Sequence, residues 1–140
     1  MNRKFQLRGI EKGFTLIEIL IAIAIMAILA SIALSQHMNQ QKRAKVSSYA
    51  EPMARVCLMD LAAYCVENPN TSLSINSTFG KNCLPSITTP AGNVMISGIA
   101  PSCNADGSLI DGSVTAVLAT ITDYTATCTI IENGFKCTVE

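Results

Sequence analysis

The sequence predicts an α+β fold in which a long N-terminal helix packs on a C-terminal antiparallel β-sheet, with disulfides cross-linking the chain. Three observations predict this fold: a long apolar run near the start, alternating apolar and polar residues near the end, and six cysteines after the apolar run. The length of 140 residues allows one domain with a small appendage. Charged residues make up 14% of the chain, against about a quarter in soluble domains. This composition argues against a disordered chain, a collagen and an ordinary cytosolic enzyme.

The apolar run covers residues 14–34 and is interrupted only by Thr15, Glu18 and Ser31. A helix of this length extends about 32 Å, enough to cross a hydrocarbon core of about 30 Å. The side chains of residues 1–13 carry a net charge of +3, and those of residues 14–140 carry −3. Because Lys and Arg favour the cytoplasmic side of a membrane, we expect the start of the chain to stay inside and the C-terminal part to be exported.

Beyond the apolar run, a more polar segment keeps a helical pattern up to residue 67. Apolar residues recur there at threes and fours and form one stripe. Its members are Val46, Tyr49, Met53, Val56 or Cys57, Leu61, and Tyr64 or Cys65. Pro52 predicts a kink, because its ring removes a backbone hydrogen bond and crowds the preceding turn. Asn68-Pro69 closes the helix, which we therefore expect to cover roughly residues 14–67.

The C-terminal half predicts an antiparallel sheet of three to four strands. Residues 93–100 and 113–122 are rich in strand-forming residues and are bounded by Gly, Pro and Asp-Gly pairs. A hairpin follows, in which Asn133-Gly134 supplies the tight turn. Its apolar residues alternate with polar ones, and we expect them to face the helix stripe. These residues are Ala126, Cys128, Ile130, Phe135, Cys137 and Val139.

The six cysteines predict disulfides, since the C-terminal part is expected in an oxidising compartment and contains no C-x-x-C pair. They are Cys57, Cys65, Cys83, Cys103, Cys128 and Cys137. On a helix, Cys57 and Cys65 lie about 12 Å apart along the axis, beyond the limit of about 7 Å between bridged Cα atoms. Cys128–Cys137 is the preferred bridge, although a two-residue Asn-Gly turn makes this pair diagonal. Cys57 and Cys65 then pair with Cys83 and Cys103 in an order that the sequence leaves open.

The sharpest local feature is Lys12-Gly13-Phe14-Thr15-Leu16-Ile17-Glu18, where a basic leader ends in glycine before an apolar span that contains a carboxylate. It resembles the prepilin signal of type IV pilins and of type II secretion pseudopilins, over residues 1 to about 45. The resemblance implies that a membrane-embedded prepilin peptidase cuts after Gly13 and that the new amine of Phe14 is methylated. It also implies a leader (1–13) that is removed, a transmembrane and assembly helix (14–45) and a globular head (46–140).

Glu18 is the residue for which we expect an assembly role. An ionised carboxylate inside a bilayer costs several kcal/mol, so it must be neutralised, paired or functional. Cleavage before Phe14 creates an amine that is normally cationic at neutral pH. The resemblance implies that Glu18 of one subunit accepts the amine of the next subunit and thereby sets the register. The alternative is a snorkelling carboxylate in a generic anchor, favoured by the helix dipole.

An ordinary secretory signal is the other alternative for the N-terminal region, because Ala33-Leu34-Ser35 imitates a cleavage site. We reject it, since the apolar run exceeds the usual length of about 7–15 residues and contains a glutamate.

The resemblance implies a structural filament subunit that is not an enzyme and uses no cofactor. Its expected partners are other copies, related pilins, the prepilin peptidase and the inner-membrane assembly machinery. It is expected in the inner membrane before assembly and in an extracellular pilus afterwards, supporting adhesion, twitching motility or DNA uptake. The alternatives are a minor pilin, a pseudopilin with a binding or priming role, and a membrane-anchored periplasmic domain. An uninterrupted stretch at residues 27–35 and the six cysteines are compatible with a minor subunit or with a major pilin of a harsh environment.

The remaining motifs are weaker. Asn104-x-Asp106-Gly107 with Asp111 resembles a calcium loop but lacks the glutamate expected at its twelfth position, so a turn is expected there and no metal site. The single histidine, His37, has no second histidine with which to form a metal site or a catalytic triad, and no nucleophile or phosphate-loop motif is present. The basic run at residues 42–45 offers few contacts for DNA, and we expect it to be a solvated face.

Overall fold

The computed structural model describes residues 13–76, 78–132 and 134–140. The predicted leader, apart from Gly13, and Asn133 of the predicted turn lie outside these residues. The chain divides into two compact units, residues 1–37 and 38–140, and the boundary falls inside the helix α1 (Leu16–Glu67). The structure confirms the α+β fold, with one long helix, an antiparallel sheet and three disulfides.

Within the first unit, the described residues consist of a short non-helical start and the first part of α1. Every described residue up to His37 is exposed. This stretch has the length and composition of a membrane-crossing helix. It begins two residues later than the sequence predicted, because Thr15 forms the N-cap.

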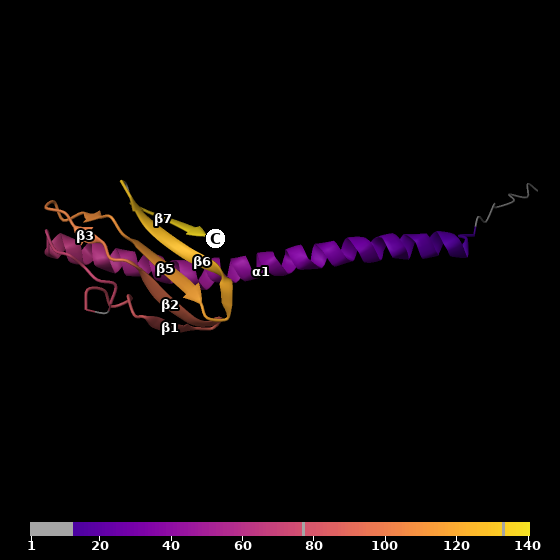
Figure 1. The fold of residues 1–140 in the computed structure, drawn as a ribbon, viewed down its shortest axis with the longest axis horizontal. Coiled ribbons are helices and arrows are strands. Elements are labelled where there is room, and N and C mark those ends of the chain that lie inside the picture. The colour runs from indigo at the N-terminus through magenta and orange to yellow at the C-terminus, as the bar shows by residue number, and fades with distance from the viewer. Residues whose placement is uncertain (1–12, 77, 133) are drawn as a thin grey trace, which may run out of the picture. The chain divides into compact units, whose positions relative to one another are not determined.

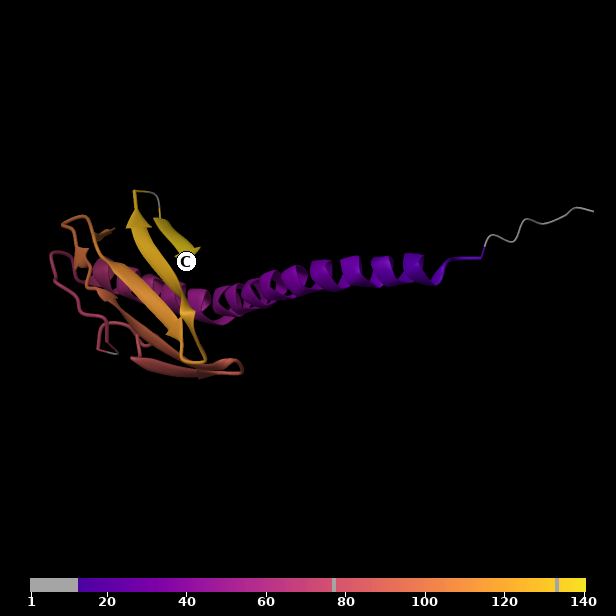
Figure 2. The same ribbon diagram turned by 45° about the vertical axis from the view of Figure 1, so that its right-hand side comes forward.

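In the second unit, five antiparallel strands form one sheet in the order β1-β2-β5-β6-β7 (Figure 1). Two short strands, β3 and β4, form a separate hairpin. Turning the view shows the large sheet as a single layer beside the C-terminal part of α1 (Figure 2). The strands are β1 (Ser86–Thr89), β2 (Gly92–Ile99), β3 (Ser102–Cys103), β4 (Leu109–Ile110), β5 (Ser113–Leu118), β6 (Ile121–Ile131) and β7 (Gly134–Val139).

The core lies between one face of α1 and one face of the sheet. On the helix the buried residues recur at threes and fours: Val46, Ala50, Ala54, Cys57, Leu58, Leu61 and Cys65. The sheet contributes Val94, Ile96, Val114, Ala116, Leu118, Ala126, Cys128 and Val139. The buried stripe is rotated from the predicted one, since Ala50 and Ala54 occupy its centre and Tyr49 and Met53 lie at its border. Two alanines carry a weak apolar signal in sequence, although their small side chains fit well against a sheet.

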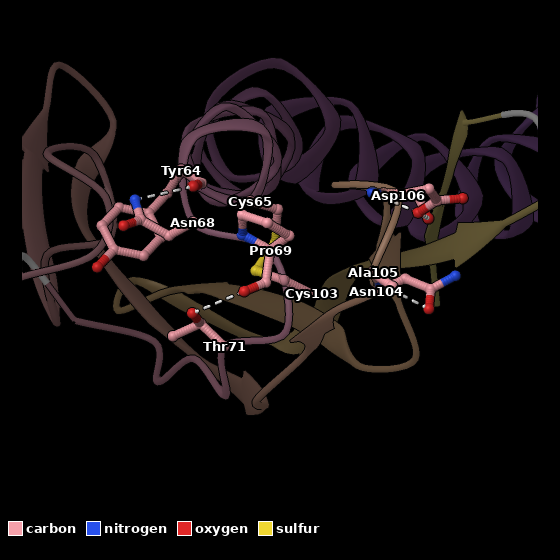
Figure 3. Close-up of a disulfide and its surroundings, with 10 residues drawn as sticks. Tyr64, Cys65, Asn68, Pro69, Thr71, Cys103, Asn104, Ala105 and Asp106 are labelled. Atoms are coloured by element: carbon pink, nitrogen blue, oxygen red, sulfur yellow. Dashed lines mark hydrogen bonds between the residues drawn. A yellow bond between two sulfur atoms is a disulfide. The ribbon is translucent and has the colours of Figure 1, made fainter.

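The helix continues through Pro52 without interruption. It ends at Glu67, and this end is the one that the sequence predicted from Asn68-Pro69. The amide nitrogen of Asn68 donates to the Tyr64 carbonyl at 3.0 Å, which satisfies one of the last helical carbonyls. The Asn68 side chain donates to the same oxygen at 3.3 Å (Figure 3).

Two strand predictions were wrong in detail. The strand expected at 113–122 is divided by a turn at Ala119 and Thr120 into β5 and the start of β6. Strand β1 was not predicted, because only Ile87 of its four residues is strongly apolar. Pairing with β1 gives β2 a second neighbour and makes the sheet five-stranded rather than three- to four-stranded.

The last hairpin also differs in register from the prediction. Its strands pair up to Ile131↔Gly134, so Gly134 lies in a strand rather than in a two-residue turn. Cys128 and Cys137 are therefore directly opposed instead of diagonal, and their Cα atoms are 4.0 Å apart in a disulfide. A shift of one residue in the loop was enough to change this relation.

The other two disulfides join α1 to the segments that follow it. Cys57 pairs with Cys83, and Cys65 pairs with Cys103, which resolves the order left open by the sequence. Figure 3 shows the second bridge beside the end of the helix. There the segment 70–73 runs along 101–104, with the Cys103 amide donating to the Thr71 carbonyl at 2.9 Å. The first bridge thus fixes the segment before β1 to the helix, and the second fixes β3 to it.

Candidate processing and assembly site

Gly13 and Phe14, the predicted processing residues, lie outside the helix and are exposed. The residues 13–15 form no regular secondary structure, and helix α1 begins directly after them. The Phe14 side chain is 78% exposed, and a side-chain carbon placed on Gly13 would have nothing within 4 Å. The peptide bond between them is therefore in accessible, non-helical backbone, which is the form that a peptidase needs to bind.

Thr15 is a residue whose role the sequence reasoning missed. Its hydroxyl oxygen accepts a hydrogen bond from the Glu18 backbone amide at 3.4 Å, and its carbonyl accepts from the same amide at 3.1 Å. This is the arrangement of a helix N-cap with the acceptor three residues before the donor. The spacing Thr15-x-x-Glu18 immediately before an apolar run is the capping-box signature, and it could have located the helix start.

Glu18 consequently lies in the first turn of α1, near the positive end of the helix dipole. It is exposed, and no ion pair involving Glu18 occurs among the residues that the structure describes. Phe14 and Glu18 are separated by the cap, so the structure does not place them on one continuous helical turn. The carboxylate is thus available to a cation from outside the chain.

The helix surface around Glu18 is apolar on every side. Thirteen large apolar side chains between residues 14 and 34 are each 51–83% exposed. They are Phe14, Leu16, Ile17, Ile19, Leu20, Ile21, Ile23, Ile25, Met26, Ile28, Leu29, Ile32 and Leu34. Removing this surface from water is worth on the order of 10–20 kcal/mol. Such a segment must be covered by lipid or by other helices.

The basic run after the apolar segment contacts the chain's own sheet. Lys42 forms an ion pair of 2.8 Å with Asp123 at the start of β6, and this hydrogen bond raises the pKa of the lysine. Arg43 donates to the Val139 carbonyl at the end of β7, at 3.0 Å. Two of the three cations expected on a solvated face therefore tie the helix to the strand ends, and Lys45 remains exposed.

The segment that resembled a calcium loop is a turn. The Asp106 carboxylate accepts from the Ser108 amide at 2.9 Å and from its hydroxyl at 2.6 Å, and these bonds lower the pKa of Asp106. The Gly107 amide donates to the Asn104 carbonyl at 3.1 Å. These local hydrogen bonds are those of an Asx turn.

The comparisons with known proteins concern this same N-terminal region. Residues 8–34 match the family model of the prokaryotic N-terminal methylation motif, a stretch that contains Gly13, Phe14 and Glu18. Two type IV major fimbrial proteins FimA of Dichelobacter nodosus are each 38% identical to the chain over 60 residues. A third from the same organism is 49% identical over 41 residues. In this region the chain is therefore similar to type IV pilins.

The similarity to these pilins is local. The first two alignments cover 39% of this chain and 38% of each fimbrial protein, and the third covers 29% and 26%. No solved structure matched the chain. The shared part is thus a minor fraction of this chain and of each fimbrial protein.

Proposed function

We propose that the chain is a structural subunit of a type IV pilus-like filament. A prepilin peptidase cleaves it after Gly13 and methylates the amine of Phe14, and the exposed apolar helix anchors it in the inner membrane. The inner-membrane assembly machinery then transfers it into an extracellular filament with other copies and related pilins. There the helix is covered by neighbouring helices.

The observation that carries this proposal is the exposed apolar helix with its single carboxylate, joined to an accessible Gly13–Phe14 bond and the N-terminal methylation motif. The described apolar residues before His37 are all exposed. A folded chain with this much uncovered apolar surface requires a membrane or an assembly. The match to the N-terminal methylation motif favours a membrane before assembly and a filament afterwards.

Within this proposal Glu18 specifies the register between subunits rather than adding stability. A buried ion pair adds little net stability because both ions lose their hydration, but it penalises every arrangement that leaves one ion unpaired. Glu18 has no cationic partner among the described residues, so the cleaved amine of a neighbouring Phe14 fits this role.

The experiment is to compare the substitutions Glu18→Gln and Glu67→Gln in cells that process the chain. Both remove one exposed carboxylate from α1, but only the first lies in the apolar segment. We expect Glu18→Gln to be cleaved and to yield few filaments, and Glu67→Gln to assemble normally. Normal filament yield from Glu18→Gln would contradict the register role, whereas an absence of filaments from the unaltered chain would contradict the proposed function.

The proposed filament supports adhesion, twitching motility or DNA uptake. DNA is the weakest of these ligands, because Lys42 and Arg43 are bound within the chain. The few other cations on the head, Lys45, Arg55, Lys81 and Lys136, offer little for phosphate contacts. A minor pilin, a pseudopilin and a membrane-anchored periplasmic domain remain the competing roles. Filaments missing from a deletion strain, but labelled by an antibody to the head in its parent, would favour the major subunit over all three.

A further inference from the structure

An apolar groove lies at one end of the head, between the β3–β4 hairpin and the end of the β6–β7 hairpin. Two adjoining hollows form it, the larger with a volume of about 470 Å³. They share five lining residues: Ser108, Leu109, Ile130, Ile131 and Glu132. Ile110 and Ile131 on its wall are 39% and 49% exposed. We call this hollow the end groove.

The end groove is acidic as well as apolar. Asp111 and Glu132 line it, and no lysine or arginine appears among the described residues that do. Both carboxylates are exposed, and neither forms an ion pair within the described part of the chain. An occupant that fits this surface has an apolar contact group and a cation close to it.

The opposite end of the unit 38–140, which is taken as the head from here on, offers such a group. Met38 is 54% exposed, and Lys45 follows it by seven residues, so the two lie on one face of α1 about two turns apart. Lys42 lies beside them and pairs with Asp123. Although Asp123 and Glu140 lie near this end, Lys45 is without an ion-pair partner among the described residues. We call Met38, Lys42 and Lys45 the basic end.

The end groove and the basic end of one head are too far apart to meet. Lys42 contacts Asp123, which lies eight residues before Ile131 on β6, or about 26 Å along the strand. The helix gives the same separation, because Ala62 borders the groove and is 17 residues beyond Lys45, about 26 Å along the axis. A contact between the two surfaces therefore requires two molecules.

We propose that the end groove of one copy receives the basic end of a second copy of this chain, with Lys45 placed against Asp111 and Glu132. Complementary surfaces at opposite ends of one body form a head-to-tail contact, which generates a ring or an open filament instead of a twofold dimer. This contact rests on the proposed filament function. It adds a specific interface between heads to the packing of the apolar helices.

The direct test is zero-length carbodiimide cross-linking of sheared filaments assembled from a mixture of ¹⁴N- and ¹⁵N-labelled full chains. The Lys42–Asp123 pair, at 2.8 Å, supplies an internal positive control within one copy. We expect a mixed-isotope cross-link from Lys45 to Asp111 or Glu132 in filaments, and its absence in the detergent-solubilised monomer. Filaments that show the control link without either of these Lys45 links would overturn the proposed contact while leaving the filament function intact. If the chain forms no filaments, the proposed function itself fails.

Charge exchange provides an independent readout. Glu132→Lys and Lys45→Glu are each expected to weaken subunit association about two- to fivefold per contact, the size expected for an exposed ion pair. Combining them restores the attraction, so the double variant should recover the filament yield that each single variant loses. Lys136→Glu is the matched control, because Lys136 lies on β7 and is not among the residues that line the groove. Failure of the double variant to recover, with the single variants impaired, would refute the pairing.

Discussion

The three disulfides differ in the length of chain that they close, and this predicts unequal effects of removing them. The bridges Cys57–Cys83, Cys65–Cys103 and Cys128–Cys137 span 26, 38 and 9 residues. In the chain-entropy model, their contributions to the free energy of unfolding are about 3.5, 3.9 and 2.6 kcal/mol. The hairpin bridge is the weakest because it closes the shortest loop and so removes the least entropy from the unfolded chain.

The assay is thermal unfolding of the unit 38–140 under non-reducing conditions, with each cysteine pair replaced by alanine. At about 4 °C per kcal/mol, we expect the Tm to fall by about 10 °C without the hairpin bridge and by about 14–16 °C without either helix bridge. The circular dichroism spectrum at low temperature shows whether each variant keeps its fold. A hairpin variant that loses as much stability as the other two would refute the reasoning from loop length.

Three further predictions concern the head. Leu58→Ala is expected to lower the free energy of unfolding by about 3–5 kcal/mol, because Leu58 is fully buried. Met59→Ala changes a half-exposed neighbour and is expected to lower it by much less. Urea unfolding of both variants measures this difference. Gly98→Ala is expected to lower the free energy of unfolding by at least about 2 kcal/mol, since φ is +147° and the new carbon would lie 2.1 Å from a carbonyl oxygen of β5. Gly134 has a similar φ but open space around it, so Gly134→Ala should lower it by less in the same assay. Asp106 has a pKa below its ordinary value of 3.8, so its hydrogen bonds stabilise the head above that pH and are lost as the pH falls through the lower, folded-state pKa. Asp106→Asn, compared by Tm between pH 2 and 6, should flatten this acid-side decline, and an unchanged slope would contradict it.

The sequence was most informative where one physical requirement dominates. The apolar run predicted a helix of membrane-crossing length. Asn68-Pro69 predicted where the longer helix that continues from this run ends, and the C-terminal boundary of α1 was predicted correctly. Cys57 and Cys65 could not pair with each other, and Cys128–Cys137 was the preferred bridge. This predicted that Cys57 and Cys65 bond to Cys83 and Cys103, without their order. Within the site, the motif around Gly13 and Glu18 located the region that the family comparison also identified.

What the sequence did not reveal depends on contacts between distant segments. The buried face of α1 centres on Ala50 and Ala54, whose small side chains say little until the sheet that covers them is known. The opposed register of the last hairpin depends on a one-residue shift in its loop. The end groove is formed by two hairpins that are separated along the chain, so no local pattern indicates it. By contrast, the Thr15 cap was visible in the T-x-x-E spacing and was overlooked.

The most direct test of the account is mass spectrometry of the chain's N-terminal peptide, taken from surface filaments of the cells that make it. The account predicts a mature chain that begins at Phe14 with one methyl group on its amine. A chain in those cells that still begins at Met1, or that begins at any residue other than Phe14, would contradict it.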